Sequence, residues 1–101
     1  MRVEVILKRR NGKVDAKGVF EEGQFTVEKG STISEETHFD GYNKILKLRS
    51  DKEIVENCKL KKDIVFRSAS AAGAFVTGTS TNGMKAWKTL DGRPLSETIS
   101  G

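Results

Sequence analysis

The chain has 101 residues, of which 36% are hydrophobic and 32% charged. This length and composition fit one small core, so we expect a single domain over residues 1–101. No apolar run approaches the ~20 residues that cross a bilayer, and no apolar leader follows Met1. The single cysteine, Cys58, excludes a disulfide framework or a cysteine-based zinc site. These features predict a cytoplasmic protein with no membrane partner, no metal and no other cofactor.

The 18 basic and 14 acidic side chains give a net charge of +4, and they are unevenly distributed. Residues 1–17 and 44–67 each carry a net charge of +4, whereas residues 18–43 carry −5 and residues 68–101 carry +1. Two basic blocks around an acidic one can fold into a surface with a basic face, which attracts phosphates in a salt-dependent way. An ordinary solvated surface has a similar composition, so charge alone leaves nucleic-acid binding open.

The first thirty residues predict a three-stranded antiparallel meander. Residues 3–7, 14–20 and 24–29 alternate apolar and polar side chains, as half-buried strands do. Asn11-Gly12 between the first two is a strong hairpin signal. Gly18 interrupts the second strand and suggests a bulge. One face of this sheet is apolar and needs a cover.

The rest of the chain predicts two helices and a further strand. Apolar residues recur at helical spacing over residues 42–57, which favours one helix packed on the sheet, either continuous or broken near Ser50-Asp51. Residues 64–66 form a short apolar strand, and residues 69–76 form a second helix between an N-cap at Ser68 and a C-terminal Gly78. We therefore expect an α+β fold: a small antiparallel sheet of three to five strands with two helices packed on one face.

Candidate nucleic-acid-binding residues gather late in the chain. They are Arg67, Ser68, Ser70, Asn82, Lys85, Trp87 and Lys88. Trp87, between two lysines, can stack on a nucleobase while the lysines hold phosphates, or it can anchor the core. Asn82-Gly83 can form an anion-binding nest or read an adenine edge, or it can form a plain turn.

Other polar residues can contact phosphates. Ser68 and Ser70 stand at a helix start, where free amides favour anions, although simple capping uses the same residues. Arg67 just before them can add a phosphate contact. The basic triplet at residues 8–10 can grip a nucleic-acid backbone, or it can be a solvated hairpin end.

No residue pattern supports catalysis. His38 and Cys58 are the single representatives of their types and have no partner at metal or dyad spacing. The sequence contains no P-loop, no G-x-G-x-x-G and no H-E-x-x-H. We therefore predict no catalytic residue, no metal site and no enzyme activity.

Residues 68–88 resemble the end of the DUF4357 family, whose pattern runs Ser-Pro-Ser-Ala-Ala, then Gly, then Asn-Gly-Trp and Trp-Lys. Residues 15–18 and 29–31 are similar to earlier motifs of that family, and residues 91–95 to a later one. The resemblance therefore covers about residues 14–96.

The chain departs from the family pattern at three positions. Ala69 replaces the usual proline, which leaves the N-cap intact. Met84 replaces a tryptophan, so any base stacking by that ring is lost, whereas a core role is tolerated. Cys58 stands where a glycine is usual.

The resemblance implies a DNA-associated accessory module. The family is often found C-terminal to GIY-YIG nuclease domains and in restriction-modification contexts, and its ending is also similar to the RAMA domain, proposed to read modified DNA. We therefore expect a non-catalytic nucleic-acid-binding module, with DNA as partner and a nuclease or methyltransferase as associated enzyme. The alternative is a protein-interaction or structural module that docks on a partner enzyme, with an exposed apolar patch around Met84 and Phe75.

Overall fold

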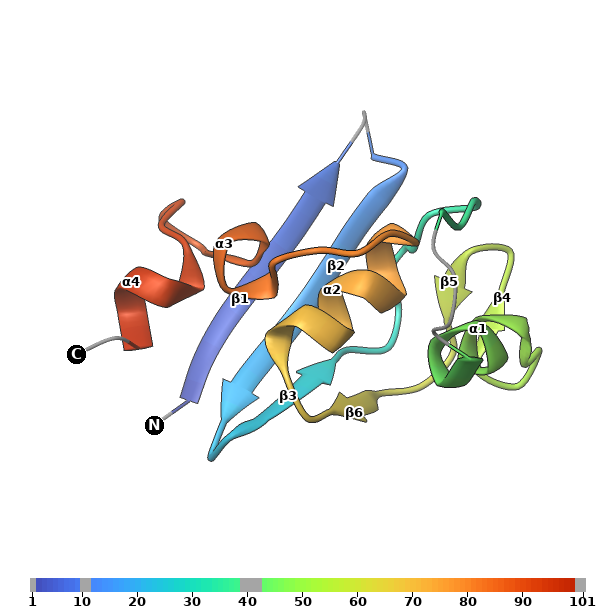
Figure 1. Cartoon of the computed structure of the whole chain (residues 1–101), viewed down its shortest axis with the longest axis horizontal. Helices are drawn as coiled ribbons and strands as arrows, with labels where there is room; N and C mark the ends of the chain where they lie inside the picture. The colour runs from blue at the N-terminus through green and yellow to red at the C-terminus, as the bar shows by residue number, and fades with distance from the viewer. Residues whose placement is uncertain (1, 10–11, 39–42, 100–101) are drawn as a thin grey trace.

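The computed structural model describes residues 2–9, 12–38 and 43–99. Within them, five strands form one antiparallel sheet in the order β6-β3-β2-β1-β7, which confirms the α+β class and the N-terminal meander (Figure 1). The strands are β1 (Arg2–Arg9), β2 (Val14–Glu21), β3 (Gln24–Val27), β6 (Ile64–Phe66) and β7 (Lys88–Thr89). Arg10 and Asn11 of the predicted hairpin, and Tyr42 at the start of the predicted first helix, lie outside the described residues. None of the described helices is long and apolar enough to cross a membrane.

Gly18 does not form the expected bulge. Strands β1 and β2 pair residue for residue, with Val5 opposite Gly18 and Ile6 opposite Lys17. A Cβ atom at Gly18 would lie 2.5 Å from a ring carbon of Phe25. The glycine therefore makes room for the aromatic ring of the next strand and does not bend its own strand.

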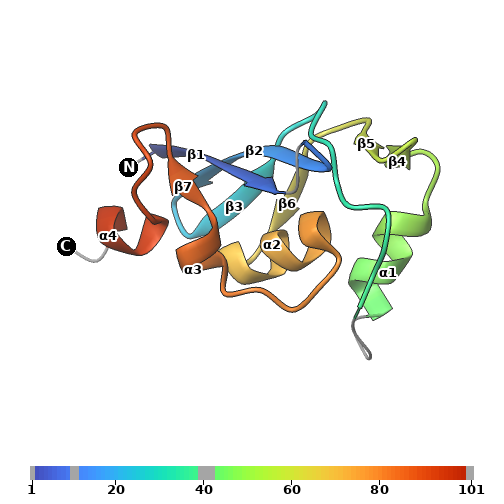
Figure 2. The same ribbon diagram turned by 90° about the horizontal axis from the view of Figure 1, so that it is seen from above.

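Two helices cover one face of the sheet (Figures 1 and 2). Helix α2 (Ala69–Thr77) contacts β2, β3 and β6, and α3 (Gly83–Ala86) packs beside α2. The Ser68 hydroxyl accepts a hydrogen bond from the backbone N–H of Ala71 at 3.1 Å, and Gly78 ends α2 in the left-handed region at φ 76°. Both predicted caps of this helix are confirmed. A last short helix, α4 (Leu95–Ile99), follows β7.

The first helix, α1 (Asn43–Ser50), is shorter than predicted and packs against α2 and β4 beyond one end of the sheet (Figure 2). It ends because the Asp51 carboxylate accepts the N–H of Glu53, and the Asp51 carbonyl accepts the next two N–H groups. This turn leads into a separate hairpin, β4 (Val55–Glu56) and β5 (Lys59–Leu60).

The turn of this second hairpin holds two residues other than glycine in the left-handed region. Asn57 and Cys58 adopt left-handed φ angles of 52° and 63°. A glycine takes this conformation without steric cost, whereas Asn57 and Cys58 adopt it with a Cβ atom. The hairpin forms in place of the second half of the predicted helix.

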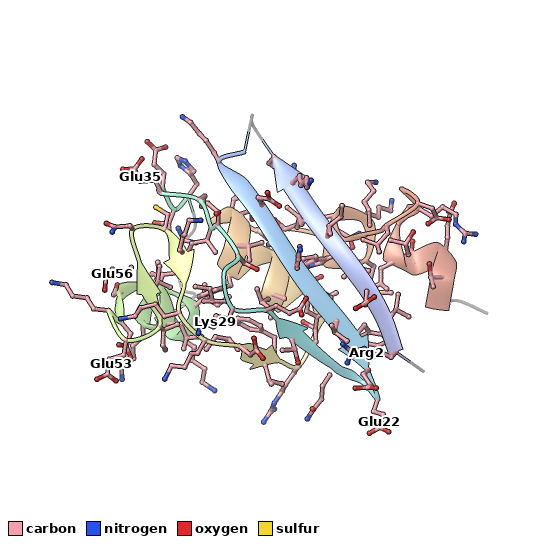
Figure 3. All side chains as sticks on the ribbon, turned by 180° about the vertical axis from the view of Figure 1, so that it is seen from behind. Arg2, Glu22, Lys29, Glu35, Glu53 and Glu56 are labelled. Atoms are coloured by element: carbon pink, nitrogen blue, oxygen red, sulfur yellow. The ribbon has the colours of Figure 1, made fainter. Side chains whose placement is uncertain are left out.

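The second face of the sheet is open and carries charges of both signs (Figure 3). Arg2 on this face lies 3.9 Å from both Glu4 and Glu21. Lys17 and Lys88 flank Ile6 in the strand pairing. Because acidic and basic side chains alternate here, the open face is not a uniformly basic surface.

Candidate functional site

The segment that carries the family resemblance forms the joint between α2 and α3. The Ser70 hydroxyl accepts a hydrogen bond from the Gly83 N–H at 3.0 Å, and the Ala69 carbonyl accepts the indole N–H of Trp87 at 3.1 Å. A Cβ atom at Gly83 would lie 2.1 Å from the Ala69 carbonyl carbon and oxygen. The backbones of the two helices are therefore in direct contact. Ser70, Ala69, Gly83 and Trp87 all take part in this contact.

The predicted base-stacking role of Trp87 is wrong. Its side chain is 0% exposed, and its ring centroid lies 4.6 Å from that of Phe25. The ring is enclosed between the sheet and the start of α2, so neither of its faces can meet a base. Met84, one helical turn before Trp87, is half-buried and packs against the same core, as a gap-filling methionine does.

The two serines at the start of α2 serve the fold. Ser68 caps the helix, and Ser70 holds Gly83. The capping alternative is confirmed for Ser68. Arg67 is exposed and forms no ion pair within the described part of the chain, so its phosphate contact stays a prediction.

A cleft of about 570 Å³ lies at the end of the β1–β2 hairpin. Three basic side chains from three separate segments line it: Arg9 ends β1, Lys13 precedes β2 and Lys85 lies on α3. All three are exposed, and none forms an ion pair with another described residue. The structure thus places Lys85 of α3 beside two cations of the β1–β2 hairpin, which lies far from it in the sequence.

Polar and acidic groups complete the lining of the cleft. Glu35, Glu36 and His38 come from the segment before α1, and His38 lies 3.4 Å from Glu36. The loop between α2 and α3 contributes the hydroxyl of Thr79 and the carboxamide of Asn82. The cleft therefore offers positive charge together with hydrogen-bond donors and acceptors.

Arg49 of α1 fixes the acidic segment beside the cleft. Its guanidinium donates hydrogen bonds to the carbonyls of Phe75 and Ser34, and to the Ser34 hydroxyl at 3.2 Å. Burial lowers the pKa of Arg49 from its ordinary value, an effect that the nearby Cys58 partly offsets. Because a guanidinium carries several N–H donors, one arginine can satisfy all of these acceptors at once.

The end of α2 supports the same segment. The His38 N–H donates to the Gly78 carbonyl at 2.7 Å. A Cβ atom at Gly78 would lie 2.0 Å from the Glu36 carbonyl oxygen, so the glycine permits this close approach. The Thr77 hydroxyl lies 2.9 Å from that of Thr81 and holds the neighbouring loop.

The structure brings only part of the predicted site together. Asn82 and Lys85 line the cleft. Lys88 pairs with Ile6 outside the cleft lining, although its ammonium donates to the Lys85 carbonyl at 3.4 Å, and Trp87 is inside the core. Arg67 follows β6, which pairs with β3 at the other edge of the sheet.

Sequence reasoning missed most of the cleft. Lys13, Glu35 and Glu36 were not singled out as binding residues, and Arg9 was recognised only as part of the basic triplet. The hairpin signal at Asn11-Gly12 places Lys13 next to that triplet, and it was the one available clue.

One family model matches nearly the whole chain. Residues 6–99 match the family described as Domain of unknown function (DUF4357), and the chain belongs to that family. Comparisons with curated proteins and with solved structures found no match. The family membership thus fixes the domain type over nearly the whole chain.

Proposed function

We propose that this domain is a non-catalytic nucleic-acid-binding accessory module, with DNA as its partner, acting in the cytoplasm beside a nuclease or methyltransferase of a restriction-modification system. The observation that supports it best is the convergence of Arg9, Lys13 and Lys85 on one cleft. The three cations outnumber the carboxylates of Glu35 and Glu36 in the same lining, and none of them forms an ion pair with another described residue. They can therefore attract a phosphate, and binding releases counterions from the nucleic acid.

The exposed apolar side chains give less support to the alternative, a docking module. Of the two residues around which an apolar patch was expected, Phe75 is 0% exposed and Met84 is half-buried against the core. Among the described residues, the exposed large hydrophobics are Val65 and Leu90. Val65 lies on β6 at one edge of the sheet and Leu90 follows β7 at the other edge, so they do not form one patch.

Binding to labelled duplex and single-stranded DNA, measured by fluorescence anisotropy at increasing salt, tests the proposal. With three phosphate contacts, the expected log–log slope on a single strand is about −2, so raising the salt from ~50 to ~200 mM weakens binding roughly 20-fold. Methylated and unmethylated duplexes are compared in the same assay, because the proposed restriction-modification role implies contact with methylated DNA.

Two charge-matched triple variants locate the binding surface. We expect Arg9→Ala, Lys13→Ala and Lys85→Ala together to remove most of the binding and to flatten the salt slope. The control replaces three exposed lysines that lie outside the cleft lining, Lys47, Lys52 and Lys62, and it lowers the net charge equally. The control should retain most of the affinity. Equal losses in both variants would show diffuse charge attraction, and no binding of either DNA form at low salt would overturn the proposal.

A further inference from the structure

The cleft has the size of a site for one small ligand. Its volume of about 570 Å³ falls within the ~300–1,000 Å³ typical of ligand-binding clefts. A duplex keeps its bases paired and stacked, so it can offer such a cleft its backbone and base edges but not a whole base. An unpaired nucleotide can place its phosphate, sugar and base in the cleft together.

The charges of the lining restrict how a nucleotide can lie. Arg9, Lys13 and Lys85 attract a phosphate, whereas Glu35 and Glu36 repel one. Figure 3 shows Glu35 at the hairpin end of the sheet, where the cleft lies. A strand therefore cannot run its phosphates along every side of the cleft. This charge pattern leaves room for one phosphate among the cations. The carboxylates can then accept hydrogen bonds from the hydroxyl or amino groups of the sugar or base.

The loop between α2 and α3 supplies groups for the base. The Asn82 carboxamide forms no hydrogen bond with another described residue, although Asn82 stands at the start of α3. Asn82 lines the cleft, and a carboxamide carries two donor hydrogens and an acceptor oxygen. Thr79 is exposed beside it. The Asn82 carboxamide can therefore bind a ligand without losing a hydrogen bond to another described residue, and the exposed Thr79 is available beside it.

We propose that the cleft binds a single unpaired nucleotide unit, with its phosphate held by Arg9, Lys13 and Lys85. This inference rests on the proposed function and names the form of nucleic acid that the site takes. Such a site accepts a nucleotide within a single strand or a free mononucleotide, and it discriminates against duplex.

Competition experiments separate these ligands. A single-stranded oligonucleotide should bind about tenfold more tightly than the duplex of the same sequence, because base contacts add to the phosphate contact. Free deoxyadenosine monophosphate should displace the single strand, whereas deoxyadenosine, which has no phosphate, should not. Displacement by the mononucleotide at concentrations similar to those of the oligonucleotide would assign the site to a free nucleotide. Displacement only at higher concentrations would assign it to a nucleotide within a strand.

A cleft-filling variant tests whether the cleft itself is occupied. Thr79→Leu with Asn82→Leu fills the cleft and removes its hydrogen-bonding groups without a change of charge. The control, Gln24→Leu with Thr26→Leu, makes similar changes on β3, outside the cleft lining. Thermal unfolding checks that both variants are folded.

The expected result is that the cleft variant loses the preference for single strands and the mononucleotide competition, while the control keeps both. Unchanged preference and competition in the cleft variant would overturn the inference. Equal binding of duplex and single strand, still dependent on Arg9, Lys13 and Lys85, would overturn it as well and leave the proposed function standing. No DNA binding by the unaltered domain would overturn both.

Discussion

Gly83→Ala is expected to destabilise the domain by about 3 kcal/mol or more, at the upper end of what overpacking costs. The added Cβ atom would lie 2.1 Å from the carbonyl carbon and oxygen of Ala69. Backbone atoms cannot rotate away as a side chain does, so α3 must move off α2. That movement breaks the bond from the Gly83 N–H to Ser70 and strains the bond from Trp87 to Ala69.

Urea denaturation measures this loss, and Gly92→Ala is the matched control. A Cβ atom at Gly92 meets nothing within 4 Å, but the residue has a φ of 90°. The control therefore carries backbone strain without a collision and should cost about 1 kcal/mol. A Gly83→Ala variant as stable as the Gly92→Ala variant would show that the two helices do not pack as described.

Trp87→Ala should cost about 3–5 kcal/mol of unfolding free energy, the range for truncating a buried large aromatic side chain. The substitution removes the contact with Phe25 and leaves a cavity between sheet and helices. Trp87→Phe keeps a ring but leaves the Ala69 carbonyl without its donor, and it should cost about 1–3 kcal/mol. Thermal and urea unfolding check both values.

Leu90→Ala provides the comparison for an exposed hydrophobic residue. Leu90 is 71% exposed, so its truncation should change stability by less than about 0.5 kcal/mol. A Trp87→Ala variant that keeps its stability and loses only DNA binding would show that the indole stacks on a base and does not support the core. The burial of the ring predicts the opposite: a large loss of stability.

Local sequence signals predicted the elements whose structure is decided locally. The alternation in β1, β2 and β3 has a period of two, and Ser68 and Gly78 cap α2 through bonds to its own backbone. The break expected near Ser50-Asp51 is confirmed, because α1 ends at Ser50 and the bonds of Asp51 compete with further helix. The β4–β5 hairpin that follows was not predicted.

The candidate site depended on contacts that no local pattern contains. Trp87 between two lysines looks the same in sequence whether it stacks on a base or fills the core. Its burial follows from the packing of Gly83 on Ala69 and from the ring of Phe25. Similarly, Arg9 and Lys85 share a cleft only because the sheet and the helices close together.

The most direct test of the proposed binding site is an NMR titration of the labelled domain with a short single-stranded oligonucleotide. The largest shifts of backbone amides are expected at Lys13, at Glu35 and Glu36, and over residues 79–85. The β4–β5 hairpin and the indole N–H of Trp87 should change least. Largest shifts at the indole or on the β4–β5 hairpin, or no shifts at low salt, would contradict binding in this cleft.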